Sequence, residues 1–511
     1  VIGCADAPQR AYARVRGFYA RPSYEEARGE AAGAWRARME RLVVHTPDEN
    51  VNRMMNGWLT HQTLTCRVRA RTGAYQPGGA FGFRDQLQDM LALLPMEPDR
   101  VRAHLLVCAA RQFEDGDVMH WWHEPYLGVR THISDDLLFL PYVAAEYVRW
   151  TGDAAVLDER VRYLENRAIP EGQTDLFCAM RPGEAEETLH EHCMRAFRRA
   201  DRRGAHGLIL MGEGDWNDGM NRIGAQGRGE SVWLTMFMAA CAERYAGIAP
   251  DAADRAWLLA AADSLRAAVE EHGWDGKWYL RAYADDGRAV GSAQSECCRI
   301  DAISQAWAVE AGLDEARCRT ALDEAWKRLA DEEHGLIRLL TPPFTGEDFD
   351  PGYIRDYPAG VRENGGQYTH AACWLLLAYI HAGDAARAHR ALQLLLPMNH
   401  ADAPEKARSY RVEPYVLAAD VYDGAFPGRG GWTWYTGSAA WLYRAVLSLL
   451  GLEKRGSRVR LSALLGGWPE VSVEMKSGRS VYRLVCRVDA REVRLDGKLV
   501  DADEIEMADD G

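Results

Sequence analysis

The chain lacks the features of nucleic-acid-binding and membrane proteins. Its 75 Asp and Glu outnumber its 61 Lys and Arg, which gives a formal net charge of -14, and it contains no long basic run. This balance argues against a nucleic-acid partner. No apolar run reaches the ~18 residues that a membrane-spanning helix needs, and no signal peptide is recognisable. We therefore expect a cytoplasmic protein without a membrane span.

Motifs for metal, disulfide and nucleotide sites are also missing. The 11 cysteines are scattered and form no small-domain framework, so we expect reduced thiols, most of them buried. No HExxH is present, and His120 and His123 lie in a loop-like run rather than one helical turn apart. The glycine-rich stretches lack the Walker spacing. We therefore expect no metal and no cofactor.

Aromatic residues, in contrast, are abundant. The 511 residues include 17 Trp and 21 Tyr, and 47% of the chain is hydrophobic, which is enough for a sizeable core. This length predicts roughly three average domains, or one large domain with a smaller one. An excess of Trp suits stacking against sugars, and an acidic surface suits neutral ligands. The chain begins with Val, and we expect it to be part of a longer polypeptide.

Sequence patterns divide the chain into three predicted regions. Residues 1–47 are polar and Arg-rich and should form linker helices. Residues 48–452 show repeated helical patterns that end at glycines, such as the pattern over 254–272. Residues 453–511 alternate between apolar and polar side chains, which predicts a small β domain. Long loops join the helices, so we expect a mainly α protein whose paired helices close into a toroid with the long loops on one face.

The stretch Gly214–Gly219, which reads Gly-Asp-Trp-Asn-Asp-Gly, carries the strongest chemical signal. A carboxylic acid can protonate a leaving oxygen, an indole offers a flat platform for a sugar, and an amide binds hydroxyl groups. Glycines let the backbone turn sharply and approach a ligand closely. The combination favours carbohydrate chemistry, although Asp, Asn and Gly also make ordinary turns.

Two further stretches suit sugar or phosphate binding. Arg84 and Asp85 follow a glycine-rich turn and could clamp sugar hydroxyls, or they could simply mark a helix start. Gly365–Gly366 delivers His370 to the start of a buried helix, where an anion would bind well. His370 could equally be a histidine satisfied in the core.

The stretch Trp432–Ser438 combines hydroxyl groups with a glycine at a helix start. Thr436 and Gly437 could form an anion cradle there. Alternatively, Thr436 or Ser438 could act as a plain helix cap.

Six long motifs, in order, resemble the phosphorylases of glycoside hydrolase family 94, and most of all the phosphorylase region of cyclic β-1,2-glucan synthases. The motifs are GGAFGFRDQLQDML, ARQFEDGDVMHWW, GVRTHISDDLLFLPYVAAEYVRWTGD, GEGDWNDGMNRIGAQGRGESVW, RIDAISQAWAV and YPAGVRENGGQYTHAACW. The resemblance covers nearly all of the chain from about Thr46. It implies an (α/α)6 six-hairpin barrel over 48–452, followed by a small C-terminal β-sandwich. The family also carries a large N-terminal β-sandwich that has no counterpart here.

The resemblance also implies a role for each matching residue. Asp218, the last Asp of the Trp-Asn-Asp motif, matches the general acid. Five residues match sugar contacts: Arg84, Asp85, Trp216, Arg362 and Glu363. Three match the phosphate site: His370, Thr436 and Gly437. Where some relatives have a further phosphate-site Arg, this chain has Gly78-Gly79-Ala80, so another residue must supply that contact or it is lost.

The predicted reaction is inverting phosphorolysis of a β-glucan. An inverting hydrolase needs an acid and a base, whereas a phosphorylase replaces the base by a bound phosphate. The partners would be a β-glucan, with β-1,2 linkage preferred, and inorganic phosphate as co-substrate. The alternatives are an inverting hydrolase, with Asp215, Asp135 or Asp136 as base, and a non-catalytic glucan-binding module of a larger synthase. We expect either a homodimer or one part of a larger polypeptide.

Overall fold

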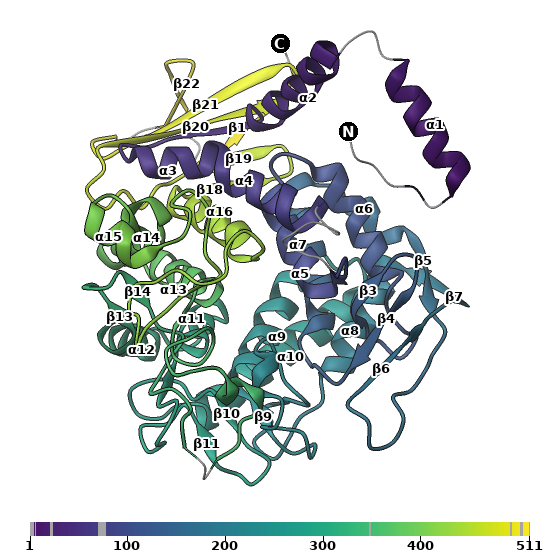
Figure 1. Ribbon diagram of the computed structural model, residues 1–511, viewed down its shortest axis with the longest axis vertical. Coiled ribbons are helices and arrows are strands. Elements are labelled where there is room, and N and C mark those ends of the chain that lie inside the picture. Colours follow the sequence, from purple (N-terminus) through teal and green to yellow (C-terminus); the bar gives the residue numbers. More distant parts are fainter. Residues whose placement is uncertain are drawn as a thin grey trace.

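The computed structural model describes residues 5, 7–20, 24–69, 78–346, 349–490, 493–500 and 504–509, and it is rich in helices. A ring of six largely buried helices forms its centre (Figure 1). Each helix contacts the next along the chain and the last contacts the first. The six are α5 (Phe83–Leu93), α7 (Phe139–Thr151), α9 (Val232–Ala246), α11 (Ala302–Glu310), α13 (Thr369–His381) and α16 (Ser438–Leu449).

A second set of helices packs outside this ring. They are α6 (Pro98–Ala109), α8 (Leu189–Ala200), α10 (Ala252–His272), α12 (Glu315–Leu329) and α14 (Ala385–Leu395). These helices are amphipathic, whereas every residue from Thr369 to Ile380 of α13 is buried. The helix predicted over 254–272 is confirmed as α10: Asp251 caps its start by accepting from two backbone amides, and Gly273 follows its end.

The gap in the outer layer beside α16 and α5 is filled by one continuous helical stretch that alternates between α and π turns. Its parts are α3 (Glu49–Arg53), η1 (Met54–Trp58), α4 (Leu59–His61) and η2 (Gln62–Arg69). The remaining helices are α1 (Pro8–Tyr19), α2 (Tyr24–Met39), α15 (Pro404–Tyr410), η3 (Asp136–Leu138), η4 (Ala154–Asp158), η5 (Asp218–Met220), η6 (Tyr353–Asp356) and η7 (Pro397–His400).

Short strands connect the helices and were not predicted. One sheet has the order β2-β3-β4-β6: β2 (Phe81–Gly82), β3 (Met119–His123), β4 (Leu127–Thr131) and β6 (Asp175–Ala179). A second four-stranded sheet is formed by β8 (Ile209–Leu210), β9 (Glu230–Ser231), β10 (Ala282–Tyr283) and β11 (Ala289–Val290). The other strands form pairs: β5 (Arg160–Leu164) with β7 (Pro182–Thr188), β12 (Ile300–Asp301) with β15 (Leu340–Thr341), β13 (Ala330–Asp331) with β14 (Leu336–Ile337), and β16 (Gln367–Tyr368) with β17 (Asp420–Val421).

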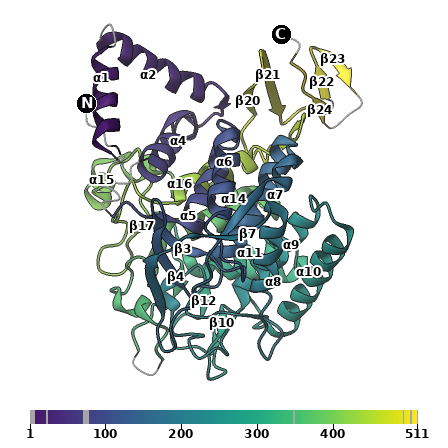
Figure 2. The same cartoon turned by 90° about the vertical axis from the view of Figure 1, so that its right-hand side faces the viewer.

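The C-terminal region is built from strands, as predicted, and its elements gather at the end of the molecule that also holds α1 and α2 (Figures 1 and 2). They are β18 (Leu452–Arg455), β19 (Arg458–Leu461), β20 (Glu470–Ser477), β21 (Ser480–Arg487), β22 (Val493–Leu495), β23 (Lys498–Val500) and β24 (Ile505–Glu506). The β-sandwich and the region boundaries stay predictions.

One part of the predicted linker is not helical. Residues Leu42–His45 form strand β1, which pairs antiparallel with β20. Alternating burial of Leu42 and Val44 explains the difference, because their side chains enter the core from one face of a strand. The expectation of linker helices over 1–47 is therefore wrong at these four residues.

Candidate active site

A polar cavity of about 530 Å³, which we call the first cavity, lies where α5, α13 and α16 begin. It is lined by residues from widely separated parts of the chain, and it brings together all nine residues that the sequence nominated. These are Asp218, Arg84, Asp85, Trp216, Arg362, Glu363, His370, Thr436 and Gly437.

The two carboxylates of the Gly214–Gly219 loop lie in different surroundings. Asp215 is fully buried and receives two hydrogen bonds from Arg281, at 2.7 and 2.5 Å, and one from the Ser231 hydroxyl at 2.6 Å. Asn217 then caps a short 3-10 turn by accepting from the Gly219 amide at 3.1 Å. The turn leaves Asp218 in the first cavity with 36% of its side chain exposed. Asp215 anchors the loop, and Asp218 is the carboxylate that can reach a ligand.

Arg84 joins Asp218 to a buried pair of carboxylates. Its guanidinium donates to Asp218 Oδ1 at 2.6 Å and to Asp135 Oδ1 at 2.5 Å, and it lies 3.5 Å from Asp136 Oδ1. Burial opposes the charge on Arg84, but the three carboxylates outweigh burial and raise its pKa. Since Oδ1 of Asp218 is taken by Arg84, its Oδ2 is the oxygen available to exchange a proton with a substrate.

His120 stands beside this network. Its Nδ1 is 2.6 Å from Asp136 Oδ2, and its Nε2 is 3.9 Å from Asp218 Oδ2. Burial disfavours a charged imidazole, but the interactions with Asp136 and Asp218 outweigh burial and raise the pKa of His120 to about 9. His120 is therefore a cation at neutral pH next to Asp218.

The three residues nominated for phosphate lie together. Thr436 and Gly437 precede α16, and a Cβ placed on Gly437 would meet His370 Nδ1 at 3.4 Å and Arg67 Nη2 at 3.6 Å. Nε2 of His370 has no hydrogen-bond partner among the described residues. Burial lowers the pKa of His370 to about 3, so the ring is neutral and can donate one N–H to an anion.

Arg67 supplies the positive charge that the three residues lack. It reaches the first cavity from η2, is almost fully buried, and donates through Nε to both oxygens of Asp89, at 3.2 and 3.0 Å. Its guanidinium also lies over the Tyr435 ring, 4.4 Å from the ring centroid. The sequence analysis missed Arg67, because it lies in a helical run of alternating Arg residues with no distinguishing pattern.

Aromatic rings and a charged pair form the other walls. Trp216 packs against Tyr368 and His370, with ring centroids 5.5 and 5.3 Å apart. Arg362 lies 3.3 Å from Glu363, and burial raises the pKa of Glu363 despite that neighbour. Tyr353, Tyr357 and Trp432 complete the wall; the sequence analysis did not nominate the two tyrosines.

The arrangement can hold a sugar beside Asp218 and place an anion nearby. Two further carboxylates line the first cavity, Asp85 with Arg67 3.7 Å away and Glu363 with Arg362 3.3 Å away. The carboxylates considered as hydrolytic bases, Asp135, Asp136 and Asp215, are buried and do not line the first cavity. Asp135 and Asp136 are engaged by Arg84 and His120 instead. The geometry therefore favours an anion, rather than a water activated by one of these three groups, as the reacting partner.

The ring of buried helices carries a polar, aromatic-lined cavity at one end, which suits a carbohydrate ligand. Residues 34–451 match the model of the catalytic domain of the glycosyl hydrolase 94 superfamily, and the chain belongs to this family. No helix among the described residues is long and apolar enough to cross a membrane.

The chain is similar to named relatives in this family. It is 44% identical over 501 residues to the cyclic β-(1,2)-glucan synthase NdvB of Rhizobium meliloti (strain 1021). This match covers 96% of this chain and 18% of the synthase. It is 30% identical over 526 residues to the solabiose phosphorylase of Paenibacillus borealis, across 100% of this chain and 64% of that enzyme. The chain thus spans less than two thirds of either relative.

A solved structure shares the fold. The GH78 family rhamnosidase of Bacillus sp. GL1 superposes with a TM-score of 0.56 at 14% identity, over 85% of this chain and 39% of the rhamnosidase.

Proposed function

We propose that the chain catalyses the inverting phosphorolysis of a β-glucan, releasing α-glucose 1-phosphate and a glucan one residue shorter. The observation that carries the proposal is the first cavity, in which the partly exposed Asp218 faces the same space as a group of anion-binding residues. Asp218 would protonate the glycosidic oxygen through Oδ2. Phosphate would attack C1 from the opposite face of the sugar, which inverts the anomeric configuration.

The remaining cavity residues would divide the substrate between them. Arg84, Asp85 and Trp216 would hold the non-reducing glucose, and Arg362 with Glu363 would contact the acceptor sugar. A neutral His370, Thr436 and the Gly437 amide would bind phosphate oxygens. Arg67 would balance the phosphate charge and so take the place of the arginine that is missing at Gly78-Gly79-Ala80.

Linkage and context follow from the relatives. The name of the synthase relative points to β-1,2-glucan as substrate and to a larger synthase as the polypeptide in which this chain would work. The closed ring of six helices with its outer helices supports an (α/α)6 six-hairpin barrel as the catalytic body.

The test is to incubate the protein with inorganic phosphate and β-1,2-, β-1,3- or β-1,4-linked oligoglucosides, and to measure glucose 1-phosphate. We expect the α-anomer by NMR, with the highest rate on the β-1,2 series. Glucose released in phosphate-free buffer would show a hydrolase. Glucan binding without turnover in the intact polypeptide would show a non-catalytic module, and either result overturns the proposal.

A further inference from the structure

A second cavity, of about 610 Å³, lies at the opposite ends of the ring helices. The helices α5, α13 and α16 begin at the first cavity and end at the second, as His370 and His381 at the two ends of α13 illustrate. Strands β18 and β19 and the residues that follow them close its far side. Within the described part of the chain, the two cavities have no lining residue in common.

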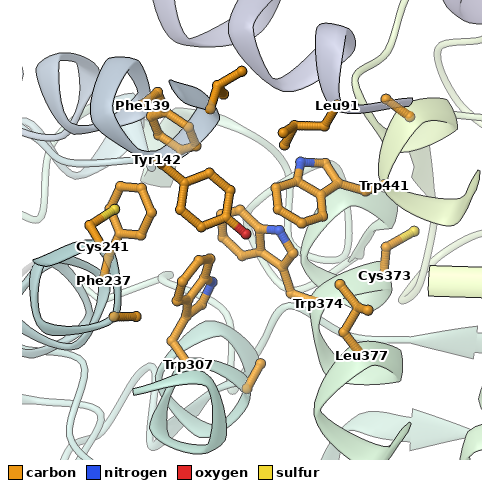
Figure 3. Packing of buried hydrophobic residues seen from close by; sticks show 14 of the residues in the cluster. Leu91, Phe139, Tyr142, Phe237, Cys241, Trp307, Cys373, Trp374, Leu377 and Trp441 are labelled. Carbon is orange, nitrogen blue, oxygen red and sulfur yellow. The ribbon is translucent and has the colours of Figure 1, made fainter. Parts of the chain in front are cut away.

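Four aromatic side chains from four ring helices line this second cavity (Figure 3): Tyr142, Trp307, Trp374 and Trp441. The rings of Trp307 and Trp441 each meet the Trp374 ring edge-on, at interplanar angles of 89°. Trp307 and Trp374 are buried, with only 2% of each residue exposed. Even so, Nε1 of neither has a hydrogen-bond partner in the part of the chain that the structure describes. Buried N–H groups normally have a partner. Both indole rings line the second cavity while each Nε1 is itself buried, so a ligand hydroxyl reaches an N–H when the ring turns slightly.

Charged residues from five ring helices form a continuous chain of ion pairs around the same cavity. Arg444 lies 3.0 Å from Glu146, Arg244 lies 3.2 Å from Glu146 and 2.8 Å from Glu310, and His381 pairs with Glu310. Burial alone would raise the pKa values of Glu146 and Glu310, but the cations outweigh it and lower both to about 2. These acids are therefore ionised and matched by cations.

The outer cations of the cavity also have partners, which are one shared carboxylate and backbone oxygens. Arg460 and Arg149 lie 2.6 and 3.7 Å from Glu453. Lys454 donates to the backbone oxygens of Trp150 and Gly456, at 2.7 and 2.5 Å. The C-terminal ends of the ring helices add partial negative charge. A charged ligand would have to break existing pairs, whereas a neutral polyol can accept from the arginines and donate to the glutamates while every pair persists.

We propose that the second cavity binds a neutral glucosyl unit, as a carbohydrate site separate from the first cavity. Aromatic walls with a few placed polar groups are the usual make-up of a small-ligand site. Two unpartnered indole N–H groups and a matched ring of charged donors and acceptors suit the hydroxyl groups of a pyranose. The choice of glucose as the sugar rests on the proposed function; the site itself does not.

The test is a calorimetric titration of a β-1,2-linked glucose disaccharide in phosphate-free buffer. We expect two sites in the unaltered protein. Trp307→Phe, which removes one unpartnered N–H and keeps an aromatic ring, should weaken one site by ~tenfold, the loss of about one hydrogen bond. Trp233→Phe is the matched control: its Nε1 is also buried without a partner among the described residues, but Trp233 does not line the cavity.

A second variant keeps the test independent of that indole. Ala463→Trp, on the far wall, should abolish the same site and leave phosphate-dependent turnover unchanged. The proposal is overturned by a single site or none, by equal effects of Trp307→Phe and Trp233→Phe, or by tighter binding of glucose 1-phosphate than of the disaccharide at the site that Ala463→Trp removes. Loss of turnover with that site intact would count against the proposed function alone.

Discussion

At the residue scale, similar side chains in one motif do different work because their neighbours differ. Asp215 and Asp218 are three positions apart in the same loop. Asp215 is held by Arg281 and Ser231 away from the cavity, whereas Asp218 is partly exposed and shares only one oxygen with Arg84. The motif could nominate both carboxylates, and the partners decide which one can react.

Replacing Asp218 tests the proton donor. Asp218→Asn keeps an oxygen that can accept from Arg84 but has no acidic proton, so we expect turnover to fall ~10²–10⁴-fold with unfolding unchanged. Initial rates and a denaturation curve measure the two effects. Asp215→Asn should instead lower the free energy of unfolding by ~3–5 kcal/mol, because it breaks a fully buried ion pair. Near-full turnover in Asp218→Asn would contradict the assignment.

Arg67 is the residue to change for the phosphate site. Arg67→Lys keeps the charge but loses the fork that reaches Asp89 and the anion together, so the KM for phosphate should rise ~tenfold at an unchanged KM for glucan. Steady-state kinetics with each substrate varied in turn measure this. Arg130→Lys is the control: Arg130 is also buried and paired with Asp115 and Asp117, but lies outside the first cavity. Equal phosphate KM values in the two variants would rule out this role.

His120 predicts a pH dependence of stability. Its pKa is about 9 in the folded protein and 6.5 ordinarily, so the folded state binds its proton more tightly than the unfolded state does. The resulting stabilisation is complete below about pH 6.5 and is lost as the pH rises through about 9. In His120→Gln, the free energy of unfolding should decline less between these pH values than in the unaltered protein. Parallel curves from urea titrations would show that His120 does not titrate in this way.

At the element scale, the helices do more than support the cavities. The starts of α5, α13 and α16 meet at the first cavity, where their unpaired amides and positive dipole ends favour an anion. Their other ends meet at the second cavity, where His381 is the last residue of α13. Which end of a helix a residue occupies therefore helps to decide the chemistry that it can do.

Gly437, at the start of α16, tests the anion cradle. Its φ of -67° is open to any residue, and an added Cβ would make ordinary contacts with His370 and Arg67. Gly437→Ala should fold normally but fill the space for phosphate, raising its KM at least ~tenfold. Gly57→Ala, where nothing lies within 4 Å of the new Cβ, serves as control. Unchanged phosphate kinetics in Gly437→Ala would place the phosphate elsewhere.

At the scale of the whole molecule, several contacts join the helical body to the C-terminal strands, among them the following two. Strand β1, which precedes the ring helices in the chain, pairs with β20. Gly451, just after α16, has a φ of +60°; its N–H donates to the Ser448 carbonyl, and its carbonyl accepts from the Ser462 N–H. The far wall of the second cavity depends on this second junction.

A substitution at Gly451 should therefore loosen the junction. An alanine Cβ there would lie 1.9 Å from the Ser462 carbonyl oxygen, so Gly451→Ala must shift the backbone as well as adopt a left-handed conformation. Gly456 has nearly the same φ, +61°, but an added Cβ there would make only a 3.7 Å contact. Gly456→Ala should therefore lower the free energy of unfolding only by the cost of the left-handed conformation, ~1–2 kcal/mol. Urea unfolding should show a larger loss for Gly451→Ala; equal losses would mean that the junction is not tightly packed.

The sequence by itself determined the local elements and the inventory of reactive groups. Helical periodicity and a following glycine predicted α10, and glycine-containing turns predicted the starts of α13 and α16, because these signals act within a few turns of chain. Alternation predicted that residues 453–511 form strands for the same reason. The paired strands of two to seven residues between helices escaped prediction, as did β1, because their partners lie elsewhere in the sequence. The motifs nominated nine residues that share one cavity. Five of them lie within two residues of the start of an α-helix: Arg84, Asp85, His370, Thr436 and Gly437.

Only the tertiary structure decided how these groups divide the work. In the fold, Asp215, Asp135 and Asp136 lie outside the first cavity, and Arg67 lies next to Gly437. His120 has acidic neighbours that raise its pKa and keep it charged. The fold also opens a second cavity from residues that read as ordinary core and surface. Burial and ion pairing depend on contacts between distant segments, and those contacts exist only once the ring of helices has closed.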